Sequence, residues 1–427
     1  MNQEERKLKR QQDTRKATTV FILFLLIMTL LVAGCVFLLN KFVFQGKPAG
    51  GSTENQTGHL AGTEEAGVPV VPAVDPMTQQ AAEFVAGMTL EDKIAQMFVI
   101  TPDALTGVSG VTAAGNTTRE AYSAKPVGGL IYMSGNLKDG EQTTTMLQNM
   151  QTIAKERTGV PAFLCVDEEG GSIARIAGNS AFAVTDVGDM SQIGATGDKQ
   201  NAYNAGTVIA TYLSEFGFNV DFAPVADVLT NAENTVIGKR SFGSDGQLVA
   251  DMVTAQLQGM SEHGVYGAVK HFPGHGGTSG DSHEGAVTTE RTLEELMEQE
   301  LVPFQRAVDA GVSFVMAGHI SAPNVTGEST PASLSKMLIT DVLRGQMGYD
   351  GIVITDAMDM GAVMGSYTSD QAAVMAIAAG VDMVLMPEDY ETAYKGVLAA
   401  VHDGTLTEER INESVIRILK IKLKMVP

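Results

Sequence analysis

The chain contains, at residues 266–283, the stretch Tyr266-Gly267-Ala268-Val269-Lys270-His271-Phe272-Pro273-Gly274-His275-Gly276-Gly277-Thr278-Ser279-Gly280-Asp281-Ser282-His283. Its first four residues are typical of a short buried strand. The remainder holds three of the protein's seven histidines, and its proline and glycines exclude a regular helix. Parallel sheets and barrels place their chemistry on loops that follow strands. The stretch therefore predicts a parallel α/β fold with a functional loop after this strand.

Short apolar runs alternate with amphipathic segments from residue 78 onward. We expect strands at 97–100, 129–133, 162–167, 219–225, 267–271, 313–318, 351–356 and 382–386. We expect helices between them, among others at 140–157, 247–262, 293–309, 334–347 and 369–379, and a terminal helix at 405–426. Eight strands separated by helices over about 340 residues predict a single (β/α)8 TIM-type barrel at 78–427.

A doubly wound open sheet is the competing fold, and the position of the polar residues favours the barrel. The polar residues at or just beyond predicted strand ends are Asp167, Asp227, Lys270, His271, His319 and Asp356. A closed barrel brings all strand ends of one polarity together on one face, whereas an open sheet scatters them.

The N-terminal segment differs in composition from the rest of the chain. Residues 1–17 are basic, and an apolar run long enough to cross a bilayer lies within 18–44. The excess of basic residues before this run places the N-terminus in the cytoplasm and the barrel outside it. Residues 31–35 also resemble a bacterial lipoprotein box, which leaves anchoring through a lipidated Cys35 as the alternative to a single-pass transmembrane helix.

Residues 45–77 are rich in Gly, Pro, Thr and Glu without periodicity, so they are expected to form a flexible, disordered linker. The formal net charge of −21 argues against nucleic acid as a partner. The two cysteines, Cys35 and Cys165, fall in the apolar run and in a predicted buried strand, so no disulfide is expected between them.

The loop that follows the predicted strand at 267–271 offers two kinds of chemistry. His271 and His275 are four residues apart, which suits a zinc pair on a helix, but Pro273 lies between them, and no metal site is expected. Asp281 precedes His283 by two residues, so its carboxylate can orient the imidazole and form a proton-transferring dyad. A solvated turn is the alternative for such a triplet taken alone.

Three other stretches supply candidate side chains. The strand at 351–356 delivers Asp356 to the open end of the barrel, where a carboxylate facing a histidine is sufficient for double displacement at an acetal carbon. Asp167 and Arg175 flank a glycine pair and can hydrogen-bond a polyhydroxylated ligand. Arg240 follows another strand and is either a ligand clamp or an ion-pair partner.

These stretches, in this order, resemble glycoside hydrolase family 3 and specifically its β-N-acetylglucosaminidase branch, from about residue 88 to the C-terminus. The 270–275 string and the Asp281-Ser282-His283 triplet carry the resemblance most specifically. The triplet distinguishes this branch from members that take a glutamate acid/base from a second domain. Ser172 departs from the Arg that is frequent in the family, and Glu168 departs from the usual Gln.

The resemblance implies a role for each candidate residue. Asp356 corresponds to the catalytic nucleophile, His283 to the general acid/base, and Asp281 to its orienting partner. The residues that correspond to those binding N-acetylglucosamine are Asp167, Arg175, Arg240, Lys270 and His271. No cofactor is implied.

The sequence thus predicts a membrane-anchored, extracytoplasmic, retaining β-N-acetylglucosaminidase that acts on peptidoglycan fragments. Alternatives are a β-glucosidase or β-xylosidase of the same family, a phosphorylase that uses phosphate in place of water, and a non-catalytic cell-wall binding protein. The retention of both candidate catalytic groups argues against the last.

Overall fold

The structure is a computed structural model that describes residues 75–426. The predicted basic tail, the transmembrane segment at 18–44, Cys35 and nearly all of the linker lie outside these residues. Among residues 75–426, no helix is both long and apolar enough to cross a bilayer.

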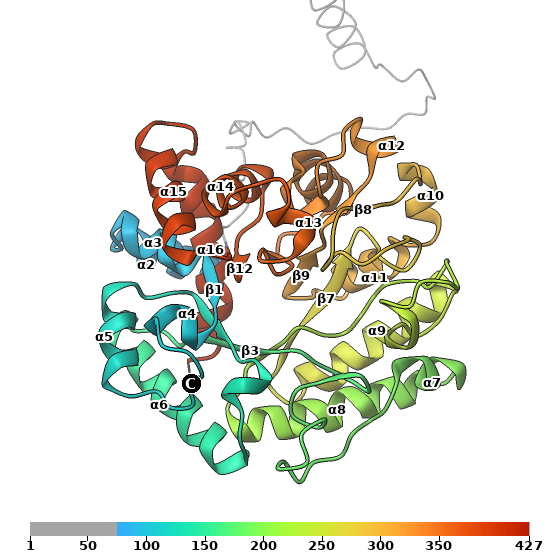
Figure 1. Ribbon diagram of the computed structural model, residues 1–427, viewed down its shortest axis with the longest axis horizontal. Helices are drawn as coiled ribbons and strands as arrows, with labels where there is room; N and C mark the ends of the chain where they lie inside the picture. Colours follow the sequence, from blue (N-terminus) through green and yellow to red (C-terminus); the bar gives the residue numbers. More distant parts are fainter. Residues whose placement is uncertain (1–74, 427) are drawn as a thin grey trace, which may run out of the picture. The chain divides into compact units, whose positions relative to one another are not determined.

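Eight parallel strands form a nearly closed barrel (Figure 1). They are β1 (Phe98–Ile100), β2 (Gly129–Ile131), β3 (Phe163–Val166), β6 (Val220–Asp221), β7 (Tyr266–Phe272), β9 (Phe314–Ala317), β11 (Ile352–Thr355) and β12 (Val384–Leu385). From β1 to β11, each barrel strand pairs with the next barrel strand along the chain, and β1 also pairs with β12. A parallel bridge between Ile354 and Met383 joins the two remaining edges. The predicted barrel is confirmed, and the open sheet is excluded.

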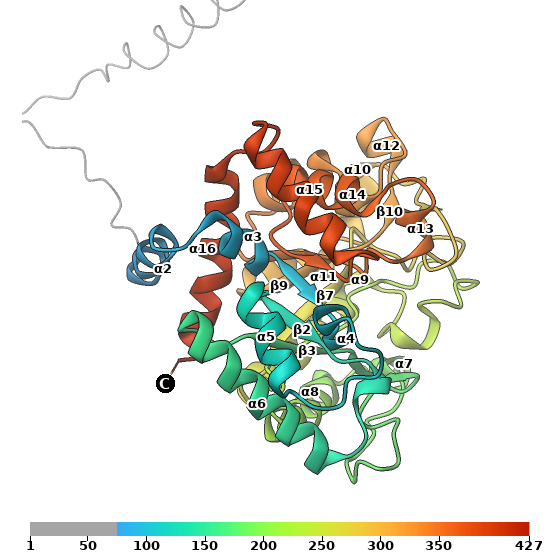
Figure 2. The ribbon, with the colours of Figure 1, turned by 60° about the vertical axis from the view of Figure 1, so that its left-hand side comes forward.

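Helices surround the strands, as Figures 1 and 2 show from two directions. They are α2 (Pro76–Ala86), α3 (Leu90–Gln96), α4 (Pro102–Thr106), α5 (Asn116–Ala124), α6 (Gly140–Thr158), α7 (Met190–Ala195), α8 (Lys199–Phe216), α9 (Gly246–Ser261), α10 (Leu293–Glu298), α11 (Val302–Asp309), α12 (Pro323–Thr326), α13 (Gly361–Met364), α14 (Ser369–Ala379), α15 (Tyr390–His402) and α16 (Glu408–Lys424). Single turns of 3-10 helix lie at η1 (Ser134–Asn136), η2 (Gly238–Arg240) and η3 (Ala332–Leu334).

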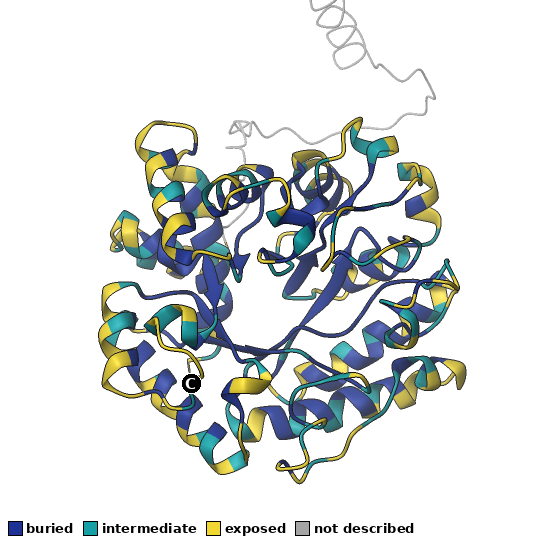
Figure 3. Ribbon diagram, in the orientation of Figure 1, coloured by how far each residue is buried: buried dark blue, intermediate teal, exposed yellow. Residues whose placement is uncertain are grey.

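The strands are buried on both faces, which explains why they are apolar runs without alternation. Figure 3 shows buried strands inside a shell of helices whose outer faces are exposed. Inside the barrel, the rings of Phe163 on β3 and Phe314 on β9 meet edge to face at a centroid distance of 5.2 Å. The barrel interior is therefore a packed core, not a channel.

Two predicted helices differ in detail from the observed ones. The segment at 293–309 is divided into α10 and α11, because Pro303 in the first turn of α11 has no N–H to donate to the preceding turn. The segment at 334–347 contains η4 (Met337–Gln346), a π-helix in place of the expected α-helix.

Small sheets build out the carboxyl end of the barrel. Strands β4 (Glu168–Gly170) and β5 (Ile173–Ala174) form a hairpin directly after β3. Strand β8 (Val287–Thr288) pairs with β10 (Ile320–Ser321), which follows β9. The loop after β7 leaves the barrel at residue 273. Because β8 pairs with β10 from residue 287 onward, the residues between 273 and 287 stay above the strand ends.

Candidate active site

A cavity of about 370 Å³ opens where the carboxyl ends of the barrel strands meet. Its lining includes seven of the eight predicted site residues, namely Asp167, Arg175, Arg240, Lys270, His271, His283 and Asp356. The eighth residue, Asp281, is hydrogen-bonded to His283. The fold therefore gathers around one cavity side chains that lie as far apart as positions 167 and 356 in the sequence.

A buried ion cluster occupies one side of the cavity. Lys270 Nζ lies 2.7 Å from Glu169 Oε1 and 3.0 Å from Asp167 Oδ1. Arg240 donates two hydrogen bonds to the same Glu169, from Nε at 2.7 Å and from Nη2 at 2.8 Å. Such a bidentate ion pair fixes both side chains, so the Arg240 and Lys270 cations are positioned before a ligand binds.

The cluster is charged at neutral pH. Burial alone would raise the pKa of Glu169, but the Lys270 ammonium and the Arg240 guanidinium outweigh burial and lower this pKa to about 2. Burial alone would lower the pKa of Lys270, but Glu169 and Asp167 raise it above its usual value. Fixed charges shielded from water bind hydroxyl groups more strongly than exposed charges do.

Arg175 reaches the cavity from the chain just after β5. Its Nη2 is 4.0 Å from Asp167 Oδ2, and its buried Nε has no hydrogen-bond partner among the described residues. A buried donor without a partner is costly unless a ligand or water satisfies it. Arg175 is therefore suited to donate a hydrogen bond to a bound ligand.

Asp227 orients His271 from below. The Asp227 carboxylate accepts hydrogen bonds from His271 Nδ1 at 2.7 Å and from the His275 backbone N–H at 2.6 Å. Burial alone would raise the pKa of Asp227, but the neighbouring imidazoles and these bonds lower it, so the carboxylate is ionised. An ionised carboxylate only accepts, so His271 Nδ1 donates; its Nε2 lies 3.5 Å from Arg240 Nη2, and the residue lines the cavity.

We expect Asp227→Asn to raise KM by about 10- to 100-fold, because the asparagine amide group can force His271 into the other tautomer. Steady-state kinetics on an aryl glycoside measure the change. The matched control is Asp341→Asn, which alters an exposed side chain on η4. An unchanged KM in Asp227→Asn would contradict this role.

The Asp281–His283 pair is formed as the sequence predicts. The Asp281 carboxylate accepts from His283 Nδ1 at 2.8 Å and from the His283 backbone N–H at 2.9 Å. Burial would raise the pKa of Asp281, but these two hydrogen bonds lower it, so the carboxylate is ionised and Nδ1 is the donor. The His283 side chain is 66% exposed, and its Nε2 is free to exchange a proton with a ligand.

Asp356 stands directly after β11, and His319 supports it. Burial alone would raise the pKa of Asp356, but His271, His319, the backbone N–H of Ala357 and Lys270 lower it. His319 is buried, and its Nδ1 atom lies 2.8 Å from Ser333 Oγ. Its Nε2 donates a hydrogen bond to the Ala357 carbonyl at 2.9 Å. The Ala357 N–H in turn donates to Asp356 Oδ1 at 2.8 Å. The site thus contains an ionised, positioned carboxylate and a separate proton donor.

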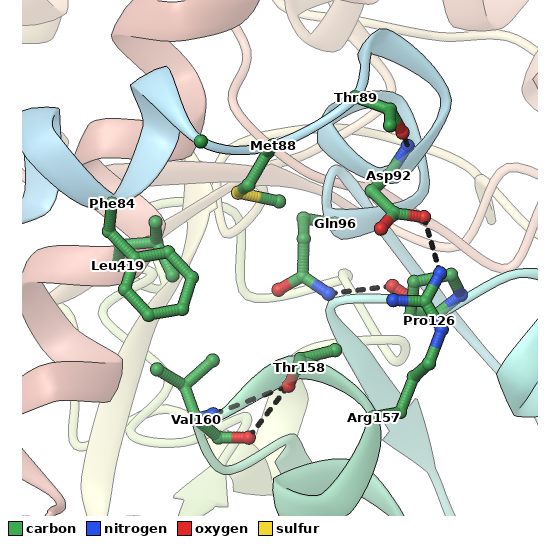
Figure 4. Close-up of a pocket in the computed structure, with 11 residues that line it drawn as sticks. Phe84, Met88, Thr89, Asp92, Gln96, Pro126, Arg157, Thr158, Val160 and Leu419 are labelled. Atoms are coloured by element: carbon green, nitrogen blue, oxygen red, sulfur yellow. Dashed lines mark hydrogen bonds and ion pairs between the residues drawn. The ribbon is translucent and has the colours of Figure 1, made fainter.

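A second cavity, of about 340 Å³, lies at the other end of the barrel (Figure 4). Its lining includes Gln96, Pro126 and Val160, which precede β1, β2 and β3. Its polar groups bind one another, since Arg157 donates to Asp92 at 2.7 Å and Gln96 donates to the Pro126 carbonyl at 2.6 Å. The amino-terminal end of a barrel serves stability, so the chemistry belongs to the first cavity.

The sequence model of the glycosyl hydrolase family 3 N-terminal domain matches residues 89–421, nearly the whole barrel. The chain belongs to glycoside hydrolase family 3. The resemblance to this family found in the sequence is thereby confirmed.

Curated family 3 relatives cover most of this chain. Beta-hexosaminidase A from Pseudoalteromonas piscicida is 33% identical over 330 residues, which are 72% of this chain and 55% of that protein. Beta-hexosaminidase LpqI from Mycobacterium tuberculosis is 31% identical over 389 residues, which are 88% of this chain and 92% of that protein. This chain therefore spans about half the length of the first relative and most of the second.

Solved family 3 structures share the barrel. A β-N-acetylglucosaminidase from Paenibacillus sp. str. FPU-7 has a TM-score of 0.74 at 38% identity, covering 79% of this chain and 63% of that one. The structure of Mycobacterium tuberculosis LpqI has a TM-score of 0.70 at 30% identity, covering 80% of this chain and 96% of that one.

The family's usual Gln is replaced here by Glu168, and the structure gives this residue a structural role. Its carboxylate accepts hydrogen bonds from the backbone N–H groups of Ile176 and Ala177, both at 2.8 Å, and from the Tyr212 hydroxyl at 2.9 Å. Burial raises its pKa above the usual value. Glu168 thus secures the loop after β5, while Glu169 is turned toward the cavity.

Sequence reasoning missed Glu169 as a site residue, although it lies only two positions after Asp167. Side chains two residues apart in extended backbone face the same way, and both of these carboxylates contact Lys270. That spacing was the available signal. The supporting roles of Asp227 and His319 had no comparable signal, because their partners are distant in the sequence.

Proposed function

We propose that this protein is a retaining β-N-acetylglucosaminidase that releases terminal non-reducing N-acetylglucosamine, with peptidoglycan fragments as its substrate. One observation carries the proposal: an ionised strand-end carboxylate and an Asp–His pair face the same cavity. These are the two groups that double displacement requires. The similarity to a β-hexosaminidase and to a β-N-acetylglucosaminidase of family 3 supports N-acetylglucosamine as the sugar.

In the first step, His283 acts as an acid and Asp356 as a nucleophile. A carboxylate oxygen of Asp356 forms a bond to the anomeric carbon as the glycosidic C–O bond breaks. His283 donates its Nε2 proton to the departing oxygen, and the electron pair of the broken bond stays on that oxygen. Asp281 stabilises the imidazolium before the transfer through its bond to Nδ1.

In the second step, His283 acts as a base. Its neutral Nε2 takes a proton from water as the water oxygen bonds to the anomeric carbon. The bond between that carbon and Asp356 breaks, which regenerates the carboxylate. Two inversions retain the β-configuration. An imidazole suits both roles because the same ring nitrogen can donate a proton in one step and accept one in the next.

The rest of the cavity suits one sugar unit. Its volume is near the lower end of the range for small-molecule sites, which favours a single residue over a long oligosaccharide. In this proposal the sugar hydroxyls bind Asp167, Arg175, Arg240, Lys270 and His271. The apolar lining residues, which include Met133, Met316, Met360 and Met386, provide a wall for an acetyl methyl group.

The proposal places the barrel outside the cytoplasm, where peptidoglycan lies. The apolar run within 18–44 and the basic residues before it support a single-pass anchor with a cytoplasmic N-terminus. Cys35 offers the lipoprotein alternative. The mass of the N-terminal peptide from purified membranes discriminates between the two, because lipidation requires cleavage before Cys35.

The test is hydrolysis of 4-nitrophenyl N-acetyl-β-glucosaminide, β-glucoside and β-xyloside by the full chain. We expect the N-acetylglucosaminide to have the highest kcat/KM and its first-formed product to be the β-anomer by NMR. Added phosphate is expected to leave the product unchanged. An α-anomer formed first would overturn the retaining mechanism, and an equal rate on the glucoside would overturn the sugar assignment.

His283→Ala isolates the proton-transfer role. We expect kcat/KM for a disaccharide to fall by about 10²- to 10⁴-fold, the usual contribution of general acid catalysis. A substrate with a dinitrophenyl leaving group needs little protonation, so its first step is expected to be much less affected. Equal losses on both substrates would argue against His283 as the acid.

A further inference from the structure

The loop that carries Asp281 and His283 is attached to the segment that carries Asp356. At the start of α13, the Gly361 backbone N–H donates to the His283 carbonyl at 3.1 Å, and the Ala362 N–H donates to the Ser282 carbonyl at 3.1 Å. Gly361 follows Asp356 by only five residues. The two proposed catalytic groups are therefore linked by a short stretch of backbone.

Gly361 allows this contact because it has no side chain. A Cβ atom at this position would lie 2.7 Å from the His283 carbonyl oxygen and 3.0 Å from both the carbonyl carbon and oxygen of Glu284. These neighbours are backbone atoms, so no flexible side chain can move away to make room. Any larger residue at position 361 must displace the loop away from α13.

The loop is also held from below. Ser282 Oγ lies 3.2 Å from His275 Nε2, and both side chains are buried. The His275 backbone N–H donates to Asp227. By contrast, the His283 ring itself is mostly exposed, and in the described part of the chain its only hydrogen bond is to Asp281. The position of the imidazole thus depends on where the backbone of residues 282–284 is held.

We propose that Gly361 is a positioning residue for the acid/base. Its contact with the His283 carbonyl sets the distance between the proton donor and the nucleophile, and through it the alignment of His283 Nε2 with the glycosidic oxygen. This inference rests on the proposed function, because it concerns how the same site transfers a proton to the leaving group. Displacement by about 1 Å is enough to impair a step that depends on alignment.

The experiment compares leaving groups in Gly361→Ala. We expect kcat/KM for a disaccharide of N-acetylglucosamine to fall by about 10- to 100-fold, because an alcohol leaving group needs the proton. For a dinitrophenyl glycoside we expect less than about threefold loss in the same constant, because that leaving group departs without protonation. Added azide, which attacks without a base, is expected to accelerate turnover of the dinitrophenyl substrate in the variant and to yield the β-glycosyl azide.

The matched control is Gly285→Ala, in the same loop. Position 285 has no heavy atom within 4 Å of an added Cβ and no left-handed backbone conformation. The same substitution there is expected to leave the ratio of the two kcat/KM values unchanged. Ser282→Ala removes the loop's contact with His275 without adding atoms, and is expected to shift the ratio in the direction of Gly361→Ala, by about threefold.

The outcomes separate the inference from the proposed function. If the wild-type protein cleaves no N-acetylglucosaminide, the proposed function is wrong. If the wild type cleaves them and His283→Ala shows the leaving-group effect, a uniform loss or no loss in Gly361→Ala overturns the positioning role. Should Gly361→Ala fail to fold, as judged by its thermal unfolding, an unchanged ratio in Ser282→Ala overturns it instead.

Discussion

Asp356→Asn is expected to lower kcat/KM for aryl N-acetylglucosaminides by about 10⁴-fold or more, equivalent to about 5 kcal/mol of lost transition-state stabilisation. The wild-type carboxylate is ionised, because His271 and His319 help to lower a pKa that burial alone would raise. An amide cannot form the glycosyl ester. It can still accept the Ala357 N–H, so the fold is expected to persist. Initial rates measure the loss, and circular dichroism checks the fold.

Asp359→Asn is the matched control, since Asp359 also brings a carboxylate to the cavity lining. Burial and the nearby Asp356 charge raise the pKa of Asp359 above its usual value, whereas the pKa of Asp356 is lowered, so Asp359 ionises less readily than Asp356. We expect less than about a tenfold loss from this change. If Asp359→Asn were the more damaging substitution, the nucleophile would have to be reassigned.

A trapped intermediate identifies the nucleophile directly. With a good leaving group and His283→Ala, the first step stays fast while the second lacks its base, so the glycosyl-enzyme is expected to accumulate. Fragmentation of the labelled peptide by tandem mass spectrometry should place the added sugar on Asp356 itself. A label on Asp167 or Asp359 would contradict the proposed role.

The barrel strands were predictable because burial on both faces leaves continuous apolar runs bounded by polar residues. Asp167 and Asp356 mark the carboxyl ends of β3 and β11 in the sequence itself. The start of α10 is also encoded locally, since Thr292 and Glu295, three residues apart, form a capping box. The break between α10 and α11 was missed, although Pro303 was its signal, whereas the π-helical geometry of η4 had no sequence signal.

The site was predictable where a residue contacts its sequence neighbours. The Asp281–His283 bond spans two residues, and its chemistry is visible in the triplet. The bond between Asp227 and His271 spans 44 residues, and the approach of Gly361 to the His283 carbonyl spans 78. Such contacts depend on how loops from different strands pack, which no local pattern encodes.

The glycines of the loop that follows β7 also show what a local sequence pattern does not encode. From the sequence they suggest a mobile loop that reaches over a substrate. In the structure, a Cβ at Gly276 would lie 2.1 Å from the Val228 carbonyl oxygen, and a Cβ at Gly274 would lie 2.8 Å from the Glu300 side chain. These two glycines allow close packing at the base of the loop, which holds its lower part in place.

Glu169→Gln is expected to lower kcat/KM by about 10²- to 10³-fold and to reduce the free energy of unfolding by about 3 kcal/mol at pH 7. The substitution leaves Lys270 and Arg240 buried with less compensating negative charge. Lys270 and Arg240 also line the cavity, so loss of their common partner is expected to raise KM. Kinetics and urea denaturation on the same preparations measure both effects.

The pH dependence distinguishes a charge effect from a packing effect in Glu169→Gln. In the folded wild type the pKa of Glu169 is lowered from 4.5 to about 2, so its contribution to stability is present above about pH 4.5 and is lost as the pH falls toward 2. The stability difference between wild type and Glu169→Gln should therefore be largest above pH 5 and shrink below pH 4. Glu120→Gln, at an exposed position on α5, should show no such dependence. A stability difference that stays constant with pH would mean that the Glu169 side chain acts by its shape and not by its charge. The charge of Glu169 would then not be what positions Lys270 and Arg240 for the sugar.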